Sequence, residues 1–112
     1  MKAIKAFIRS NRAPAALDAL CEAGITHATL TEVLAVGAGT DSAQGEVNIE
    51  LGRKVHRMVQ LEVICLDKDE LRAVELIRKA ACTMRPGDGI ITVANVNRVV
   101  KVRTGAESAE AL

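Results

Sequence analysis

A carboxylate flanked by glycines is the strongest candidate for ligand chemistry in this sequence. Gly87, Asp88 and Gly89 follow Pro86, and glycine reaches backbone conformations that other residues rarely adopt. A turn of exposed amides built in this way forms a concave site that can bind phosphate. An ordinary turn between a helix and a strand uses the same residues, so the motif by itself predicts a sharp reversal of the chain and is compatible with an anion site.

Two cations near the end of the chain are the next candidates. Lys101 and Arg103 are two positions apart, and we expect them on a short strand, where residues at this spacing point to the same side. Two cations on one side of a strand can meet a single polyphosphate. The alternative is a solvated strand edge.

A further basic cluster precedes a strongly apolar segment, and it consists of Arg53, Lys54, His56 and Arg57. Solvated charge is the ordinary interpretation of such a cluster. The alternative is a site for a small anion such as bicarbonate, or for an acidic patch on a partner protein. His56 would add pH sensitivity to that site, because an imidazole titrates near neutral pH.

The cysteines and histidines are not spaced as metal ligands. Cys21, Cys65 and Cys82 are far apart and His27 has no nearby ligand partner, so no metal site is predicted. Cysteines among apolar neighbours are expected to be buried and reduced. The sequence contains neither a secretory signal nor a membrane span, and we therefore expect a cytoplasmic location.

The elements that must position these residues follow from the spacing of apolar side chains. Alternation or β-branched residues predict strands over 2–9, 26–36, 59–65 and 90–96, and helical spacing predicts helices over 14–23 and 71–83. Residues 67–69 are expected to cap the second helix. A short strand is predicted over 98–103, and the small polar tail over 104–112 is expected to be mobile.

This order of elements predicts one α+β domain over residues 1–112 with the ferredoxin-like βαββαβ arrangement, in which two helices cover one face of an antiparallel sheet. The other face would include Phe7, Thr29, Val33 and Val100, which is apolar enough to favour oligomerisation. Residues 37–57 contain four glycines and are predicted to form a long functional loop. Its alternating middle, 46–51, could form a hairpin arm on a partner.

The composition argues against nucleic acid as a partner. The 112 residues suffice for one domain with its own core. Phe7 is the single aromatic residue, so bases of a single strand would find few surfaces on which to stack. The 15 basic and 14 acidic residues leave a net charge of +1, which provides no general positive field for a duplex.

Three motifs, in their order along the chain, resemble the PII signalling family of nitrogen regulatory proteins. They are Thr31-Glu32-Val33, Gly87-Asp88-Gly89 and Lys101-Val102-Arg103-Thr104-Gly105. The resemblance extends over nearly the whole chain. It implies a homotrimer that binds ADP, AMP or ATP in clefts between subunits, uses its long loop to regulate a target transporter or metabolic enzyme, and is not itself an enzyme.

The resemblance also implies which residues bind the nucleotide. Gly37 would contact a phosphate through its backbone, Thr29 and the main chain at Ile64 would border the adenine, and Glu62 would lie in the same cleft. The full implied set is Thr29, Gly37, Ala38, Glu62, Ile64, Gly87, Asp88, Gly89, Lys101 and Arg103.

Four positions depart from the family pattern. Gly39 replaces a glutamine that helps to hold magnesium and 2-oxoglutarate, and Met58 replaces a lysine that pairs with the keto acid. Ile90 replaces a phosphate-binding lysine, and Leu51 replaces a tyrosine that is uridylylated in some members. These changes favour a divergent member, similar to the type associated with carboxysomes and inorganic carbon, with bicarbonate as second effector, and they predict no metal cofactor.

Three other functions fit the same residues. A nitrogen-assimilation regulator would share the fold and the nucleotide cleft. A weak ATPase would use Asp88 or Glu62 as the base and the pair of cations for electrostatic stabilisation, but the sequence offers no pairing of nucleophile and base. A purely structural trimer would bind no nucleotide.

Overall fold

The computed structural model describes residues 1–36, 45–48 and 53–112. Two α-helices and five strands follow one another along this part of the chain, with bounds β1 (Lys2–Arg9), α1 (Ala13–Glu22), β2 (Ala28–Ala35), β3 (Glu46–Asn48), β4 (Arg53–Cys65), α2 (Glu70–Ala81) and β5 (Gly89–Asn95). Short 3-10 helices span Ser10–Arg12, Asp67–Asp69 and Ser108–Ala111.

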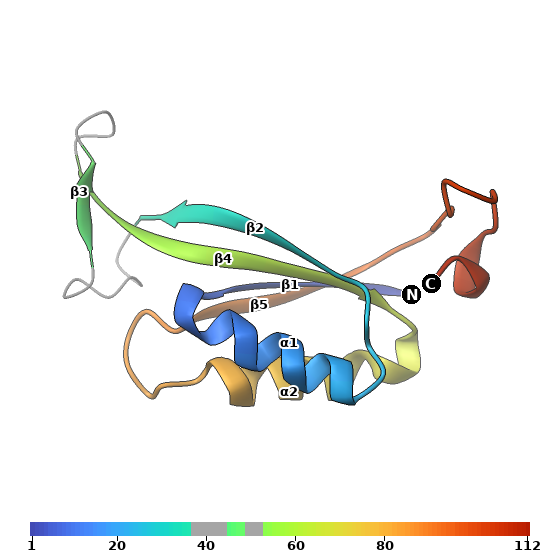
Figure 1. The fold of residues 1–112 in the computed structure, drawn as a ribbon, viewed down its shortest axis with the longest axis horizontal. Coiled ribbons are helices and arrows are strands. Elements are labelled where there is room, and N and C mark those ends of the chain that lie inside the picture. The colour runs from blue at the N-terminus through green and yellow to red at the C-terminus, as the bar shows by residue number, and fades with distance from the viewer. Residues whose placement is uncertain (37–44, 49–52) are drawn as a thin grey trace.

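The sheet has the strand order β2-β4-β1-β5. β3 pairs with residues 53–55 at the start of β4, which precede the part of β4 that pairs with β2. Every one of these pairings is antiparallel. Both helices cover the same face of the sheet (Figure 1). The predicted ferredoxin-like arrangement is therefore confirmed.

The core lies between the sheet and the two helices. Alternate residues of β1, which are Ile4, Ala6 and Ile8, point into it and are at most 2% exposed. The helices contribute small and branched side chains, among them Leu20 and Ile77, which are fully buried. Burial of one large aliphatic side chain stabilises the fold by about 2 kcal/mol, so this layer fixes which face of each strand remains open.

The open face carries the residues that alternate with the core. Phe7 lies between Gln60 on β4 and Ile90 on β5, and Val33 lies opposite Met58. Ile90 is 62% exposed in the single chain. The predicted apolar character of this face is thus present on its strands, although Val100 lies outside the sheet.

The segment predicted as a loop over 37–57 contains more strand than expected. β4 begins at Arg53, and residues 46–48 pair with residues 53–55 as a hairpin arm, without any partner protein. Val55 is 2% and His56 7% exposed, so neighbouring residues on both faces of the strand are buried here, and the sequence lacks the alternation that predicts a strand. Gly37, Ala38 and Gly39 lie outside the described residues, and so does Leu51.

The predicted strand over 98–103 is wrong, and the mobility of the tail over 104–112 stays a prediction. The only β contact of this segment within the described residues is a bridge between Val100 and Glu107, and residues 102–104 form a turn. The last residues fold into the 3-10 helix. The amide of Ser108 donates to the carbonyl oxygen of Val99 at 3.0 Å, which turns the tail back along the chain.

Three smaller expectations also need correction. Cys21 is exposed, because its neighbour Leu20 takes the inward position of α1. Cys65 is buried, as predicted. Leu71 is 83% exposed; Ala73, Ile77 and Ala81 form the buried stripe of α2 instead. The start of α2 has no side-chain capping bond.

None of the described helices combines the length and apolar character needed to cross a bilayer.

Candidate functional site

The predicted nucleotide-binding residues fall into two groups at opposite ends of the sheet. Gly87, Asp88 and Gly89 lie where β5 begins, and Thr29, Glu62 and Ile64 lie toward the other end of β2 and β4. Through β1, Glu62 is level with Thr92 and Ile64 with Ala94 on β5, so these residues lie about 10 Å and about 17 Å from the level of Gly89 along the strands, at about 3.3 Å per residue. We call residues 83–89 with Arg9 the turn half-site. Thr29, Glu62 and Ile64 with residues 98–112 are the tail half-site.

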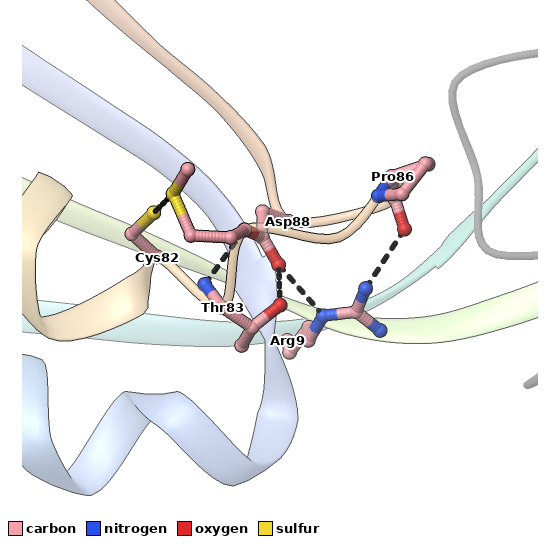
Figure 2. A network of polar contacts seen from close by, with 6 residues as sticks. Arg9, Cys82, Thr83, Pro86 and Asp88 are labelled. Atoms are coloured by element: carbon pink, nitrogen blue, oxygen red, sulfur yellow. Dashed lines mark hydrogen bonds and ion pairs between the residues drawn. The ribbon is translucent and has the colours of Figure 1, made fainter.

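The turn half-site is held by one partly buried polar network (Figure 2). Arg9, at the end of β1, donates from Nε to Oδ1 of Asp88 at 3.0 Å and from Nη2 to the carbonyl oxygen of Pro86 at 2.8 Å. The amide of Thr83 donates to Oδ2 of Asp88 at 2.7 Å, and the Thr83 hydroxyl donates to Oδ1. Both carboxylate oxygens of Asp88 therefore accept bonds from within the protein.

This network sets the charge of Asp88. Burial opposes ionisation, but the hydrogen bonds from Thr83 and the bond and charge of Arg9 outweigh it, and the pKa of Asp88 lies well below its usual range. A carboxylate with so low a pKa is a poor general base at neutral pH. Asp88 is thus suited to hold the turn in shape, with its backbone left to face a ligand.

The glycines of this turn adopt conformations that side chains disfavour. Gly87 has φ 96° and Gly89 has φ 107°. A Cβ atom on Gly89 would lie 1.6 Å from the carbonyl oxygen of Phe7, which is far inside contact distance. Gly89 is therefore required for β5 to pair with β1, whatever the turn binds.

A cleft of about 610 Å³ opens beside the turn half-site. Gly87, Arg9, Arg57 and Arg85 line it, and Glu32 is the acidic residue on its wall. Its positive side chains exceed its negative ones, so the cleft favours an anionic ligand.

The structure brings part of the predicted basic cluster to this cleft. His56 and Arg57 line it, whereas Lys54 is exposed and is not among its lining residues. The Nε atom of Arg57 is 3.3 Å from Oε2 of Glu46 on β3. The side chain of Arg53 lies outside the described side chains. The cluster is therefore divided, with two members facing the candidate site.

The tail half-site contains a second cleft of about 430 Å³. Thr29 and Glu62 face each other across β2 and β4, and both line the cleft with Ile64. Ala111 and Leu112 from the end of the chain line it as well. Three predicted residues thus meet here, together with the end of the chain, which was not among the predicted site residues.

Lys101 and Arg103 lie in the turn that precedes this segment. The amide of Lys101 donates to the oxygen of Ala106, and the amide of Gly105 donates to the oxygen of Lys101, each at 2.8 Å. At the base of the turn, Nε of Arg98 donates to Oε1 of Glu107 at 3.1 Å. Both predicted cations are exposed, and neither lines the cleft beside Gly87.

Two functional residues were missed by reasoning from the sequence. The sequence pattern predicted that Arg9 is an outward residue of a strand and that Thr83 ends a helix. Both residues instead donate hydrogen bonds to Asp88. Arg9 and Asp88 are 79 positions apart, so no local pattern signals their pairing. Among the described residues, no cluster of three metal-ligating side chains occurs.

Comparison with known proteins gives a consistent result over the whole chain. The family model for "Nitrogen regulatory protein P-II" matches residues 1–106. Proteins with that description from Mesorhizobium japonicum and Rhizobium meliloti are 36% and 33% identical to this chain over 112 residues, which is all of each chain. "Nitrogen regulatory protein GlnK" from Escherichia coli K12 is 30% identical over the same full length.

Proposed function

The chain belongs to the nitrogen regulatory protein P-II family of signalling regulators, and on this premise we propose that it binds ADP, AMP or ATP in clefts between the subunits of a homotrimer. The observation that carries this proposal is the separation of the two half-sites. Gly87 lines the first cleft and Thr29, Glu62 and Ile64 line the second, so neither of these clefts of the single chain brings the proposed phosphate-binding and adenine-binding residues together. A second copy must supply the missing half.

The geometry of the chain suits such an assembly. One copy presents the turn half-site at one end of the sheet, and its neighbour presents the tail half-site from the opposite end. A contact between unlike ends is heterologous, and it closes into a ring when the rotation between copies is right. Three copies would then enclose three equivalent clefts, and the half-exposed apolar residues of the open face would be covered.

Each half-site has a distinct role in this proposal. Exposed amides at Gly87 and Gly89 bind phosphate oxygens, and the network around Asp88 keeps the turn in shape for them. Thr29, Glu62 and the main chain at Ile64 of the neighbouring copy border the adenine. Lys101 and Arg103 of that neighbour add two positive charges beside the phosphates.

A regulatory role explains the state of Asp88 better than a catalytic one. The carboxylate is bonded to Thr83 and Arg9, and its pKa is lowered, so it is not poised to take a proton. Glu62, the other candidate base, lies in the other half-site. These features disfavour the weak ATPase.

The proposed output and second effector involve the cleft beside the turn. Segment 37–57 would carry the signal to a target transporter or metabolic enzyme, and His56, Arg57 and Arg85 would attract a small anion such as bicarbonate to the base of that segment. A second candidate is a nitrogen-assimilation regulator that responds to 2-oxoglutarate, and the names of the relatives favour it.

The decisive experiment mixes two variants that are each impaired in one half-site. Gly87→Ala damages the turn half-site, and Lys101→Ala with Arg103→Ala damages the tail half-site. Each variant alone should bind ADP weakly by calorimetry. A refolded mixture should regain strong sites, because some clefts then combine two intact halves. No recovery in a mixture shown to exchange subunits would contradict a shared site.

The effectors are separated by titration of the full chain with ATP, ADP and AMP, with and without bicarbonate or 2-oxoglutarate. Tighter nucleotide binding with bicarbonate supports a carbon-responsive regulator, and Arg57→Ala should remove this enhancement. Tighter binding with 2-oxoglutarate supports the nitrogen regulator. Failure of every nucleotide to bind would overturn the proposed function.

A further inference from the structure

The end of the chain lies on the surface that the proposed function assigns to the adenine. We propose that residues 109–112 form an intrachain cap on the tail half-site, which a nucleotide must displace. The inference rests on the proposed function, because the ligand that competes with the cap is the adenine nucleotide. It assigns to this segment an autoinhibitory role within the same cleft.

The first observation is the shared lining of the cleft. Ala111 and Leu112 line the space of about 430 Å³ together with Thr29, Glu62 and Ile64. Both terminal residues are partly buried, while residues 108–110 of the same 3-10 helix are exposed. The last two side chains therefore face the cleft wall, and the preceding residues face solvent.

The second observation is that the cap has a separate anchor. Ser108 donates its amide to the oxygen of Val99 at 3.0 Å, Glu107 forms a bridge with Val100, and Arg98 bonds to the Glu107 carboxylate. These contacts fix where the tail leaves the turn, and they lie before residue 109. The anchor holds Lys101 and Arg103 in place, whereas residues 109–112 only cover the wall.

The contacts of the cap are weak enough to be displaced. Ala111 and Leu112 offer little apolar area, and the 3-10 helix is a single short turn. A cap that covers the wall nine-tenths of the time would weaken the apparent affinity for nucleotide about tenfold. Removing the cap should recover that factor without any new contact to the ligand.

The test compares variants of the full chain and one shortened chain by calorimetric titration with ADP. Leu112→Ser should tighten ADP binding several-fold, and the chain that ends at Ser108 should tighten it by about tenfold. Glu22→Gln is the control, because this exposed residue of α1 lies in neither half-site and its replacement should leave the affinity unchanged. The anchor through Ser108 and Glu107 is intact in all three variants.

A second readout follows the cap directly. The amide of Leu112 donates to the oxygen of Ala109 at 3.3 Å, and its hydrogen exchange should accelerate when ADP saturates the full chain. Unchanged or weaker ADP binding by both Leu112→Ser and the shortened chain would overturn the cap while the proposed function stands. Loss of ADP binding by every chain, including the unaltered one, would overturn the proposed function and the cap with it.

Discussion

Each half-site contains an ion pair between described residues, and the two pairs differ in environment. In the turn half-site, the side chains of Arg9 and Asp88 are 10% and 22% exposed. In the tail half-site, the side chains of Arg98 and Glu107 are 70% and 50% exposed. A buried pair that loses one partner leaves an uncompensated charge, whereas an exposed pair is replaced by water.

This difference teaches that the halves are organised by different forces. In the turn half-site, both carboxylate oxygens of Asp88 accept hydrogen bonds from within the protein, so its shape is fixed before any ligand arrives. The tail half-site depends on backbone hydrogen bonds and on a pair that salt can screen. Changes in the first should be measured mainly as lost stability, and changes in the second mainly as altered binding.

The largest expected effect comes from Gly89→Ala. The added methyl group would lie 1.6 Å from the Phe7 oxygen at a backbone φ of 107°, so we expect a loss of at least about 4 kcal/mol in the free energy of unfolding, or no folded protein. Gly105→Ala is the control in the other half, because Gly105 has φ 72° and nothing within 4 Å of the added atom. Gly105→Ala should lower the free energy of unfolding by about 1 kcal/mol, as measured by denaturant unfolding. Equal losses in the two variants would refute the comparison.

Asp88→Asn should have the next largest effect. The amide cannot accept bonds at both former oxygens, and it removes the negative charge beside Arg9, so the free energy of unfolding should fall by about 3 kcal/mol. Urea denaturation at pH 7 measures this directly. A loss below about 0.5 kcal/mol would mean that the pair behaves like a surface pair.

The pH dependence of stability should sharpen the same contrast. Because the pKa of Asp88 is lowered in the folded state, the unfolded chain binds the proton more readily than the folded chain. The contribution of Asp88 is therefore complete above its unfolded pKa of about 4 and is lost as the pH falls toward the folded pKa. Urea midpoints between pH 6 and pH 2 should fall less steeply in Asp88→Asn than in the unaltered protein, and parallel curves would contradict this assignment.

Glu107→Gln should have the smallest effect on stability. Its pair with Arg98 is exposed, so the change should cost at most about 0.5 kcal/mol, and 0.5 M salt should hide it. Thermal unfolding at low and high salt tests this. A salt-independent loss above about 1.5 kcal/mol would show that the two half-sites are held alike.

The architecture could be predicted from the sequence because its strands and helices bury alternate or helically spaced aliphatic residues. Ile4, Leu61 and Ile77 are fully buried, and each stands in a segment with a clear period. The motif around Asp88 was also found, since its glycines and proline mark a turn. Its internal partners could not be found, because Arg9 reaches Asp88 through the fold and not along the chain.

The tail half-site was harder to predict for a different reason. Val99, Val100 and Val102 suggested a strand through their β-branched side chains, but the bonds from Lys101 to Ala106 and from Gly105 to Lys101 close a turn instead. Thr104 and Gly105 were available as turn signals. The position of Leu112 beside the same cleft as Thr29 has no signal in the sequence, because it depends on where that turn directs the tail.

The close approach of Gly89 to the Phe7 oxygen has a consequence for evolution. A descendant that had lost every ligand of this turn would still be selected to keep this glycine, because β5 could not otherwise pair with β1. Retention of Gly89 among relatives therefore records selection for folding. Divergence in nucleotide binding should be traced at positions that the backbone leaves free to vary, such as Lys101 and Arg103.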